Sequence, residues 1–308
     1  MTAASPASHP FPAGIVSVLQ TPFDRAGEVD PASLERLVEF AIGAGVDGLL
    51  LPVVASEAER LSVDERVEVV RVAAAASAGR VPLVVGATDD DPATTQRQAA
   101  LATEVGAVGY LVAAPSEAEV GADGVVAHIT AACRGSQLPV LLQDLDWSGP
   151  GVSLDTVARL LDEAVPLAGV KVETSTAGAK YTALRERFGA DLYVCGGWAV
   201  TQLVEALDRG VDAMIPESSM VALYRRVVDR YRAGDRDGAR DAFRRMLPVL
   251  AFSNQDLPTS VAFFKRLLVR RGVFATAVTR LPAPGWDAYR ERIAAELIDL
   301  VLDLEGAA

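Results

Sequence analysis

Residues 167–180, "LAGVKVETSTAGAK", contain the two side chains whose types and spacing most clearly suggest chemistry. The first half of this segment is apolar and predicts a buried strand, yet Lys171 and Glu173 lie inside it, two positions apart. Side chains two positions apart in a strand share one face. A lysine amine shielded from water loses its proton more readily, and the neutral amine condenses with a ketone to form a Schiff base. A carboxylate beside it would orient the lysine or move protons at the carbon next to the imine.

The alternative is that Lys171 is a strand-end lysine whose tip reaches solvent and pairs with Glu173.

The fold around this strand bears on which of the two interpretations of Lys171 applies. The chain alternates short apolar runs with longer amphipathic segments of helical spacing, such as residues 30–45 and 153–164. The eight apolar runs are "GIVSVLQTPF", "VDGLLLPVV", "VPLVVGAT", "VGYLVAAP", "LPVLLQD", "LAGVKVET", "ADLYVCGG" and "VDAMIPES".

Eight strand–helix units predict an α/β protein with a (β/α)8 TIM barrel, whose chemistry lies at the carboxyl ends of the strands. An open doubly wound sheet is the alternative, but no G-x-G-x-x-G turn follows any strand. We expect a disordered, proline-rich leader over residues 1–12, the barrel over 13–233, and a C-terminal helical extension over 234–308. No low-complexity linker precedes this extension, so we expect it to pack on the barrel.

Composition limits the possible partners. The chain has 308 residues and a net charge of −12, which argues against nucleic acid and anionic membranes. No apolar run is long enough to cross a bilayer, and the N-terminus does not have the pattern of a signal peptide. Cys133 and Cys195 have neither metal-ligand nor disulfide spacing, so we expect a cytoplasmic protein. No cluster of His, Cys and carboxylates predicts a metal, and Schiff-base chemistry needs no cofactor. Lys180 is expected on the sixth helix, at the surface or the rim of the barrel. Lys265 is expected on a solvated or interface face of a later helix.

Four short stretches carry a family resemblance: "TPF" at residues 21–23, the acidic loop "ASEAERLSVDER" at 55–66, "GVKVET" at 169–174, and the glycine pair 196–197 that ends the seventh run. Together they resemble the dihydrodipicolinate synthase and N-acetylneuraminate lyase superfamily. The resemblance implies a (β/α)8 barrel with a C-terminal helical extension. It also implies that Lys171 forms a Schiff base with a 2-oxo acid, and that Gly197 lies at the substrate site.

The sequence departs from the superfamily pattern where proton transfer is concerned. Members carry a tyrosine at the end of the fifth strand, and alignment on the closing Ser-Gly puts Leu142 there. Paired threonines after the second strand fall on Val54 and Ala55, and a second tyrosine falls near residues 116–117. Leucine, valine and alanine cannot carry a proton, so the hydroxyl relay is missing.

New polar groups stand near the same places, namely Ser56, Glu57, Gln143 and Asp144. Together with K-x-E, they resemble the branch that contains 2-keto-3-deoxyarabonate dehydratases. That resemblance implies a dehydratase of a 2-keto-3-deoxy sugar acid in which Glu173 removes a proton from C3. Ser56 and the loop amides would hold the substrate carboxylate, with Glu57, Gln143 and Asp144 at the same site.

Other interpretations remain open. Ser56 would only cap a turn, Glu57 would be a structural acceptor, and Asp144 an ordinary loop residue. The alternative functions are a pyruvate-dependent aldolase or an enzyme similar to dihydrodipicolinate synthase, either of which would relay protons through water or Glu117, and a non-catalytic small-molecule-binding barrel. The superfamily commonly forms tetramers of paired dimers, so the resemblance implies a homo-oligomer, either a dimer or a tetramer.

Overall fold

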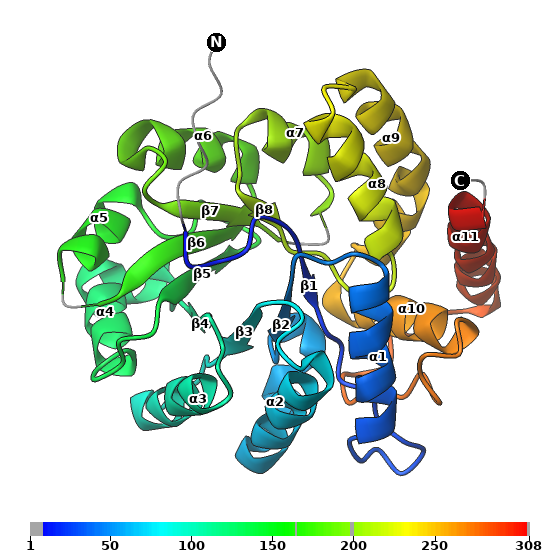
Figure 1. Cartoon of the computed structure of the whole chain (residues 1–308), viewed down its shortest axis with the longest axis horizontal. Helices are drawn as coiled ribbons and strands as arrows, with labels where there is room; N and C mark the ends of the chain where they lie inside the picture. Colours follow the sequence, from blue (N-terminus) through cyan, green and yellow to red (C-terminus); the bar gives the residue numbers. More distant parts are fainter. Residues whose placement is uncertain (1–8, 164, 198–199, 307–308) are drawn as a thin grey trace. The chain divides into compact units, whose positions relative to one another are not determined.

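The computed structural model describes residues 9–163, 165–197 and 200–306. Within this part of the chain, parallel strands β1 to β8 follow one another in sequence order around a closed barrel (Figure 1). The strands are β1 (Gly14–Val18), β2 (Gly48–Leu51), β3 (Leu83–Gly86), β4 (Gly109–Ala113), β5 (Val140–Asp146), β6 (Leu167–Thr174), β7 (Tyr193–Gly196) and β8 (Ala213–Met214). Each lies inside one of the apolar runs except β5, which extends two residues beyond its run, so the predicted (β/α)8 TIM barrel is confirmed.

The helices alternate with the strands and then continue alone. They are α1 (Pro31–Gly43), α2 (Val63–Ser77), α3 (Pro92–Glu104), α4 (Glu117–Ala132), α5 (Leu154–Asp162), α6 (Ala177–Phe188), α7 (Leu203–Asp208), α8 (Val221–Arg232), α9 (Arg236–Ser253), α10 (Leu257–Arg270) and α11 (Ala288–Gly306). Two 3-10 turns follow β2, η1 (Val54–Ser56) and η2 (Ala58–Arg60).

Local sequence signals account for several helix starts. Asp30 accepts a hydrogen bond from the Ser33 amide, and Pro31 begins α1. Ser62 and Glu65 form a reciprocal capping box at the start of α2. Each cap satisfies backbone donors that a helix leaves unpaired in its first turn.

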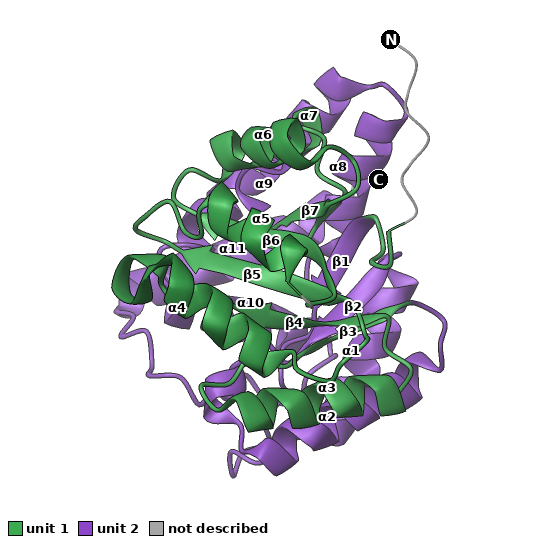
Figure 2. Ribbon diagram, turned by 90° about the vertical axis from the view of Figure 1, so that its left-hand side faces the viewer, with its two compact units in different colours: residues 1–13, 82–197, 205–214 green, residues 14–81, 198–204, 215–308 purple. Residues whose placement is uncertain are grey.

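The chain divides into two compact units, coloured separately in Figure 2. The first contains residues 1–13, 82–197 and 205–214, and the second contains residues 14–81, 198–204 and 215–308.

In the first unit, β3 to β8 pair in parallel, and β5 and β6 are its longest strands. Their register sets Gln143 beside Lys171 and Leu145 beside Glu173. Of the expected leader, residues 1–8 lie outside the described residues. Phe11 is buried against the ring of Tyr193, at 5.3 Å between centroids, and the Tyr193 hydroxyl donates to the Pro12 carbonyl at 2.7 Å.

In the second unit, β1 pairs with β2, and the last helices pack on one another. Helix α9 contacts α8, α10 and α11, and Figure 1 shows it beside α8. Helix α8 in turn contacts β1. The predicted C-terminal helical extension is therefore present. Among the described helices, none is both long and apolar enough to cross a membrane.

Candidate active site

The two residues singled out in the sixth strand form a buried ion pair. Lys171 Nζ lies 2.6 Å from Glu173 Oε2, and the same oxygen accepts a hydrogen bond of 2.6 Å from Gln143 Nε2. Lys171, Glu173 and Gln143 are only 3%, 7% and 2% exposed. The lysine tip therefore does not reach solvent, and the interpretation of Lys171 as a solvated strand-end lysine is wrong.

Strand geometry explains why these side chains meet. Lys171 and Glu173 share a face of β6 by the alternation of side chains, and Gln143 is the β5 neighbour of Lys171. Gly197 leaves the room that Glu173 needs, because a Cβ atom there would stand 2.2 Å from Glu173 Oε1. The structure therefore brings four of the predicted site residues together: Gln143, Lys171, Glu173 and Gly197.

The same register corrects the alignment at the end of the fifth strand. Leu142 pairs with Val170, so it lies on the face of β5 opposite to Gln143 and Lys171. Gln143, and not Leu142, is thus the β5 residue at the end of this strand that faces the lysine. A glutamine amide donates and accepts hydrogen bonds but does not ionise, so this position still offers no proton relay.

Asp144 lies on the other face of β5 from Gln143 and takes part in a different buried network. Its Oδ1 accepts from the Val152 amide at 2.8 Å, and Lys180 forms an ion pair with its other oxygen. Lys180 Nζ also donates to the Pro150 carbonyl at 2.6 Å. Burial raises the pKa of Asp144, although Lys180 acts in the opposite direction. The expectation of an exposed Lys180 is wrong, since it is 8% exposed.

Ser56 and Glu57 belong to the second unit, where their side chains already form hydrogen bonds within the protein. The Ser56 hydroxyl donates to the Leu19 carbonyl at 2.6 Å and is fully buried. Glu57 adopts a left-handed backbone conformation with φ of 59°, which is uncommon for a residue other than glycine. Its Oε2 accepts from the amides of Arg280 and Leu281 at 2.7 and 2.8 Å.

The other oxygen of Glu57 pairs with a lysine distant in sequence. Lys265 Nζ on α10 lies 2.5 Å from Glu57 Oε1, and both side chains are fully buried. Burial lowers the pKa of Lys265 to about 8, although Glu57 acts to raise it. The expectation of a solvated Lys265 is wrong. The sequence shows only an amphipathic helix around this lysine and gives no sign of a carboxylate 208 positions away.

Thr21 and Phe23 of the "TPF" segment contact Ser56 and the cations around Glu57. Thr21 Oγ1 donates to the Ser56 carbonyl at 2.7 Å. The Phe23 ring has Lys265 Nζ 4.3 Å and the Arg280 guanidinium 4.4 Å from its centroid, both within the range of cation–π attraction. Thr21, Phe23 and Glu57 therefore fix the loop after β2 against the segment that follows α10.

A closed (β/α)8 barrel with a buried lysine–glutamate pair on its sixth strand has the architecture of a class I lyase, which joins a lysine to an oxo acid as a Schiff base. The model of the Dihydrodipicolinate synthetase family matches residues 11–297. The chain belongs to this family and is a Schiff-base-forming lyase.

The relatives of this chain are named for different activities. L-2-keto-3-deoxyarabonate dehydratase of Azospirillum brasilense is 29% identical over 293 residues, covering 92% of each chain. 4-Hydroxy-tetrahydrodipicolinate synthase of Xanthomonas axonopodis pv. citri is 33% identical over 231 residues, covering 73% of this chain and 75% of the relative. The dihydrodipicolinate synthase structure from Rhodopseudomonas palustris superimposes with a TM-score of 0.86 at 23% identity, covering 96% of this chain and all of the other.

Proposed function

We propose that the protein eliminates water from a 2-keto-3-deoxy sugar acid bound as an imine to Lys171. The observation that carries this proposal is the position of Glu173 Oε2, 2.6 Å from the lysine nitrogen and held there by Gln143. A carboxylate so close to the imine nitrogen is within reach of the adjacent substrate carbon. Buried charge-assisted hydrogen bonds of this kind are among the stronger ones in proteins, so the carboxylate is already oriented before substrate arrives.

The proposed reaction balances without any added reactant. The Lys171 amine and the C2 ketone form an imine and release water. The protonated imine acidifies C3, and Glu173 removes one C3 proton to give an enamine. The enamine electrons expel the C4 hydroxyl, which leaves as water with a proton from the Glu173 carboxyl. Hydrolysis of the resulting unsaturated imine restores Lys171 and releases the dehydrated 2-oxo acid.

Dehydration is favoured over carbon–carbon cleavage by the groups on this face. Retro-aldol cleavage needs a base on the C4 hydroxyl, and the β5 side chain facing Lys171 is a glutamine, which cannot take a proton. The dehydratase from Azospirillum brasilense supports the same choice, because it is similar over 92% of both chains. Asp144 and Ser56 have no role in this scheme, because their polar groups are already paired with Lys180 and with the Leu19 carbonyl.

Product analysis tests the proposal. Purified protein is incubated with 2-keto-3-deoxyarabonate, and the products are identified by mass spectrometry. We expect a 2-oxo acid that has lost one water and no pyruvate, and no turnover by Lys171→Ala. Pyruvate together with an aldehyde would show that the enzyme is an aldolase.

A second candidate is 4-hydroxy-tetrahydrodipicolinate synthase activity, favoured by the 33% identity to the Xanthomonas enzyme. It is tested with pyruvate and aspartate semialdehyde. Because position 143 offers no hydroxyl, and general acid–base groups typically contribute about 10²–10⁴ in rate, we expect this condensation to be weak. Robust condensation would favour the synthase over the dehydratase.

We also infer a homo-oligomer, a dimer or tetramer, in the cytoplasm. Cys133 and Cys195 are buried free thiols, which suits a reducing compartment. A solved relative is described as the first monomeric dihydrodipicolinate synthase variant, which supports oligomers as the usual state of such enzymes. Sedimentation of the purified chain measures the assembly directly.

A further inference from the structure

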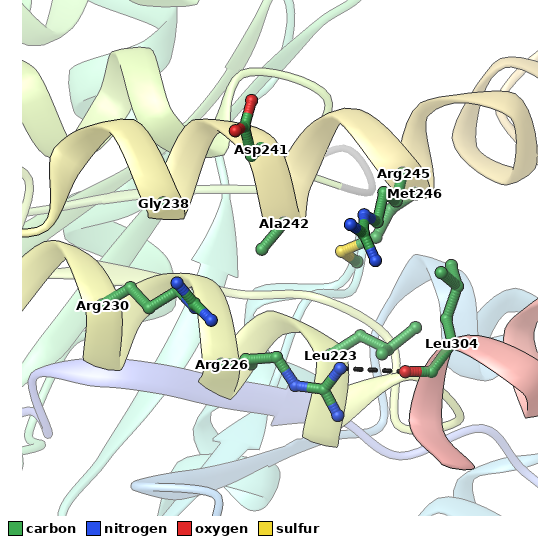
Figure 3. Close-up of a pocket in the computed structure, with 9 residues that line it drawn as sticks. All are labelled: Leu223, Arg226, Arg230, Gly238, Asp241, Ala242, Arg245, Met246 and Leu304. Atoms are coloured by element: carbon green, nitrogen blue, oxygen red, sulfur yellow. Dashed lines mark hydrogen bonds between the residues drawn. The ribbon is translucent and has the colours of Figure 1, made fainter. Parts of the chain in front are cut away.

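Helices α8 and α9 and the end of α11 enclose a cavity of about 530 Å3 in the second unit (Figure 3). Its volume is in the range of small-molecule sites. Its lining includes the cationic side chains of Arg226, Arg230 and Arg245 and the apolar side chains of Leu223, Met246 and Leu304. None of these residues belongs to the candidate active site.

The arginines use few of their hydrogen-bond donors. Arg226 donates to the Leu304 carbonyl at 2.9 Å, and Arg230 donates to Asp235 at 3.0 Å. Arg245 has no hydrogen-bond or ion-pair partner among the residues that the structure describes. Since a guanidinium carries five N–H groups, most donors at this cavity remain available.

The cavity also has more positive than negative charge. Arg226 and Arg230 are four positions apart on α8, a spacing at which like charges repel, and the ion pair with Asp235 offsets the charge of Arg230 alone. Arg245 faces them from α9 (Figure 3). Asp241 also lines the cavity, but it lies 3.6 Å from Arg244, and its carboxylate points away from the space between α8 and α9 in Figure 3. Three cations thus gather in a chain whose net charge is −12.

We propose that this cavity binds a small multivalent oxyanion, either a phosphate ester or a polycarboxylate. Guanidinium groups match both anions because their planar forks give paired N–H···O bonds. Leu223 and Met246 supply an apolar surface for the carbon skeleton of the ligand. The anion would bridge α8 to α9 and relieve the repulsion between the arginines. The inference does not depend on the reaction at Lys171.

Two probes, pyrophosphate and citrate, are titrated into the full-length protein at constant ionic strength. Binding is followed by calorimetry and by the rise in Tm that a ligand specific for the folded state produces. Arg245→Gln is the test variant, since Arg245 is exposed and the substitution leaves the core unchanged. Arg244→Gln is the matched control: it removes the same charge from the neighbouring position, which does not line the cavity.

We expect saturable binding of at least one probe, weakened at least tenfold by Arg245→Gln and less than twofold by Arg244→Gln. Binding of pyrophosphate alone would identify phosphate esters as the ligand class, and binding of citrate alone would identify polycarboxylates. Equal losses in the two variants would mean a diffuse charge effect and would overturn the site. So would the absence of saturable binding at millimolar concentrations of both probes.

Discussion

Glu173 Oε2 accepts hydrogen bonds from Lys171 Nζ and from Gln143 Nε2, both at 2.6 Å. If this lysine forms the imine, borohydride added with pyruvate should attach mass to the peptide that contains Lys171. Lys171→Ala should abolish this labelling and lower turnover by several orders of magnitude, because no second lysine shares this face of β6. Labelling of another peptide would assign the imine elsewhere.

If Glu173 is the base, its loss should slow proton exchange at the substrate without preventing imine formation. Glu173→Gln keeps the size of the side chain and one acceptor oxygen but cannot accept a proton. We expect the variant to remain trappable by borohydride while exchange of the substrate C3 protons with solvent falls by about 10²–10⁴. The exchange is measured by NMR in deuterated water. Exchange at the wild-type rate would mean that another group is the base.

Gln143 is expected to act through Glu173. Gln143→Met removes the donor and leaves a buried carboxylate oxygen with one partner fewer. Hydrogen bonds to charged groups contribute about 1.5–3 kcal/mol, so C3 exchange should slow by about ten- to a hundredfold. Leu142→Met is the control, because it lies on the opposite face of β5 and the swap conserves volume. Equal effects of the two variants would point to general damage to the strand.

At the scale of elements, two buried lysines join loops to helices. Lys180 on α6 pairs with Asp144 near the end of β5 and donates to Pro150 in the following loop, and Lys265 on α10 holds the loop after β2 through Glu57. Removing one partner of such a pair leaves an uncompensated charge, which typically costs about 3–5 kcal/mol. A pair of this kind therefore fixes a loop strongly while adding little net stability.

We predict that Lys265→Met lowers the free energy of unfolding by about 3–5 kcal/mol. The double variant Lys265→Met/Glu57→Gln should lose much less, since no buried charge is left unpaired. Denaturant unfolding of the two single variants and the double variant measures the coupling. Additive losses would show that the two residues stabilise the fold independently.

The same lysine predicts a pH dependence. Its pKa of about 8 in the folded state lies below 10.5, the ordinary value. Between these pH values the unfolded chain binds one more proton than the folded chain, so this group makes stability rise with pH across that window. Lys265→Met should remove that rise from the pH profile of the unfolding free energy. An unchanged slope between pH 8 and 10 would contradict the lowered pKa.

At the scale of the whole molecule, the second unit joins residues 14–81 to residues 215–308, so segments far apart in the sequence share one compact body. Val301 on α11 is fully buried, and α11 packs on α8 and α9, with α8 in contact with β1. Val301→Asp would bury an unpaired charge and loosen α11. We expect faster hydrogen exchange at the amides of β1 and β2, although these strands lie far away in the sequence. Asp303→Ala, at an exposed position of the same helix, should leave that exchange unchanged.

The amino-acid sequence alone determined the repeating architecture and singled out the candidate pair Lys171 and Glu173. Alternating apolar runs and amphipathic segments predicted the barrel, because parallel strands buried on both faces are almost wholly apolar. Against such a background, Lys171 and Glu173 stand out, and strand alternation places them on one face without any knowledge of tertiary contacts. The caps at Asp30 and Ser62 were equally readable, since each depends on residues within three positions.

Only the tertiary structure decided which strand residue faces Lys171 and which charged groups pair. A shift of one residue moves a side chain to the other face of a strand, so an alignment on nearby residues chose Leu142 where the register of β5 and β6 selects Gln143. Lys180 and Lys265 looked like exposed helix residues because their carboxylate partners come from other elements of the chain. Local periodicity reports which face of a helix is apolar. It does not report a buried charge whose cost is offset by a distant partner, because that offset exists only once the chain has folded.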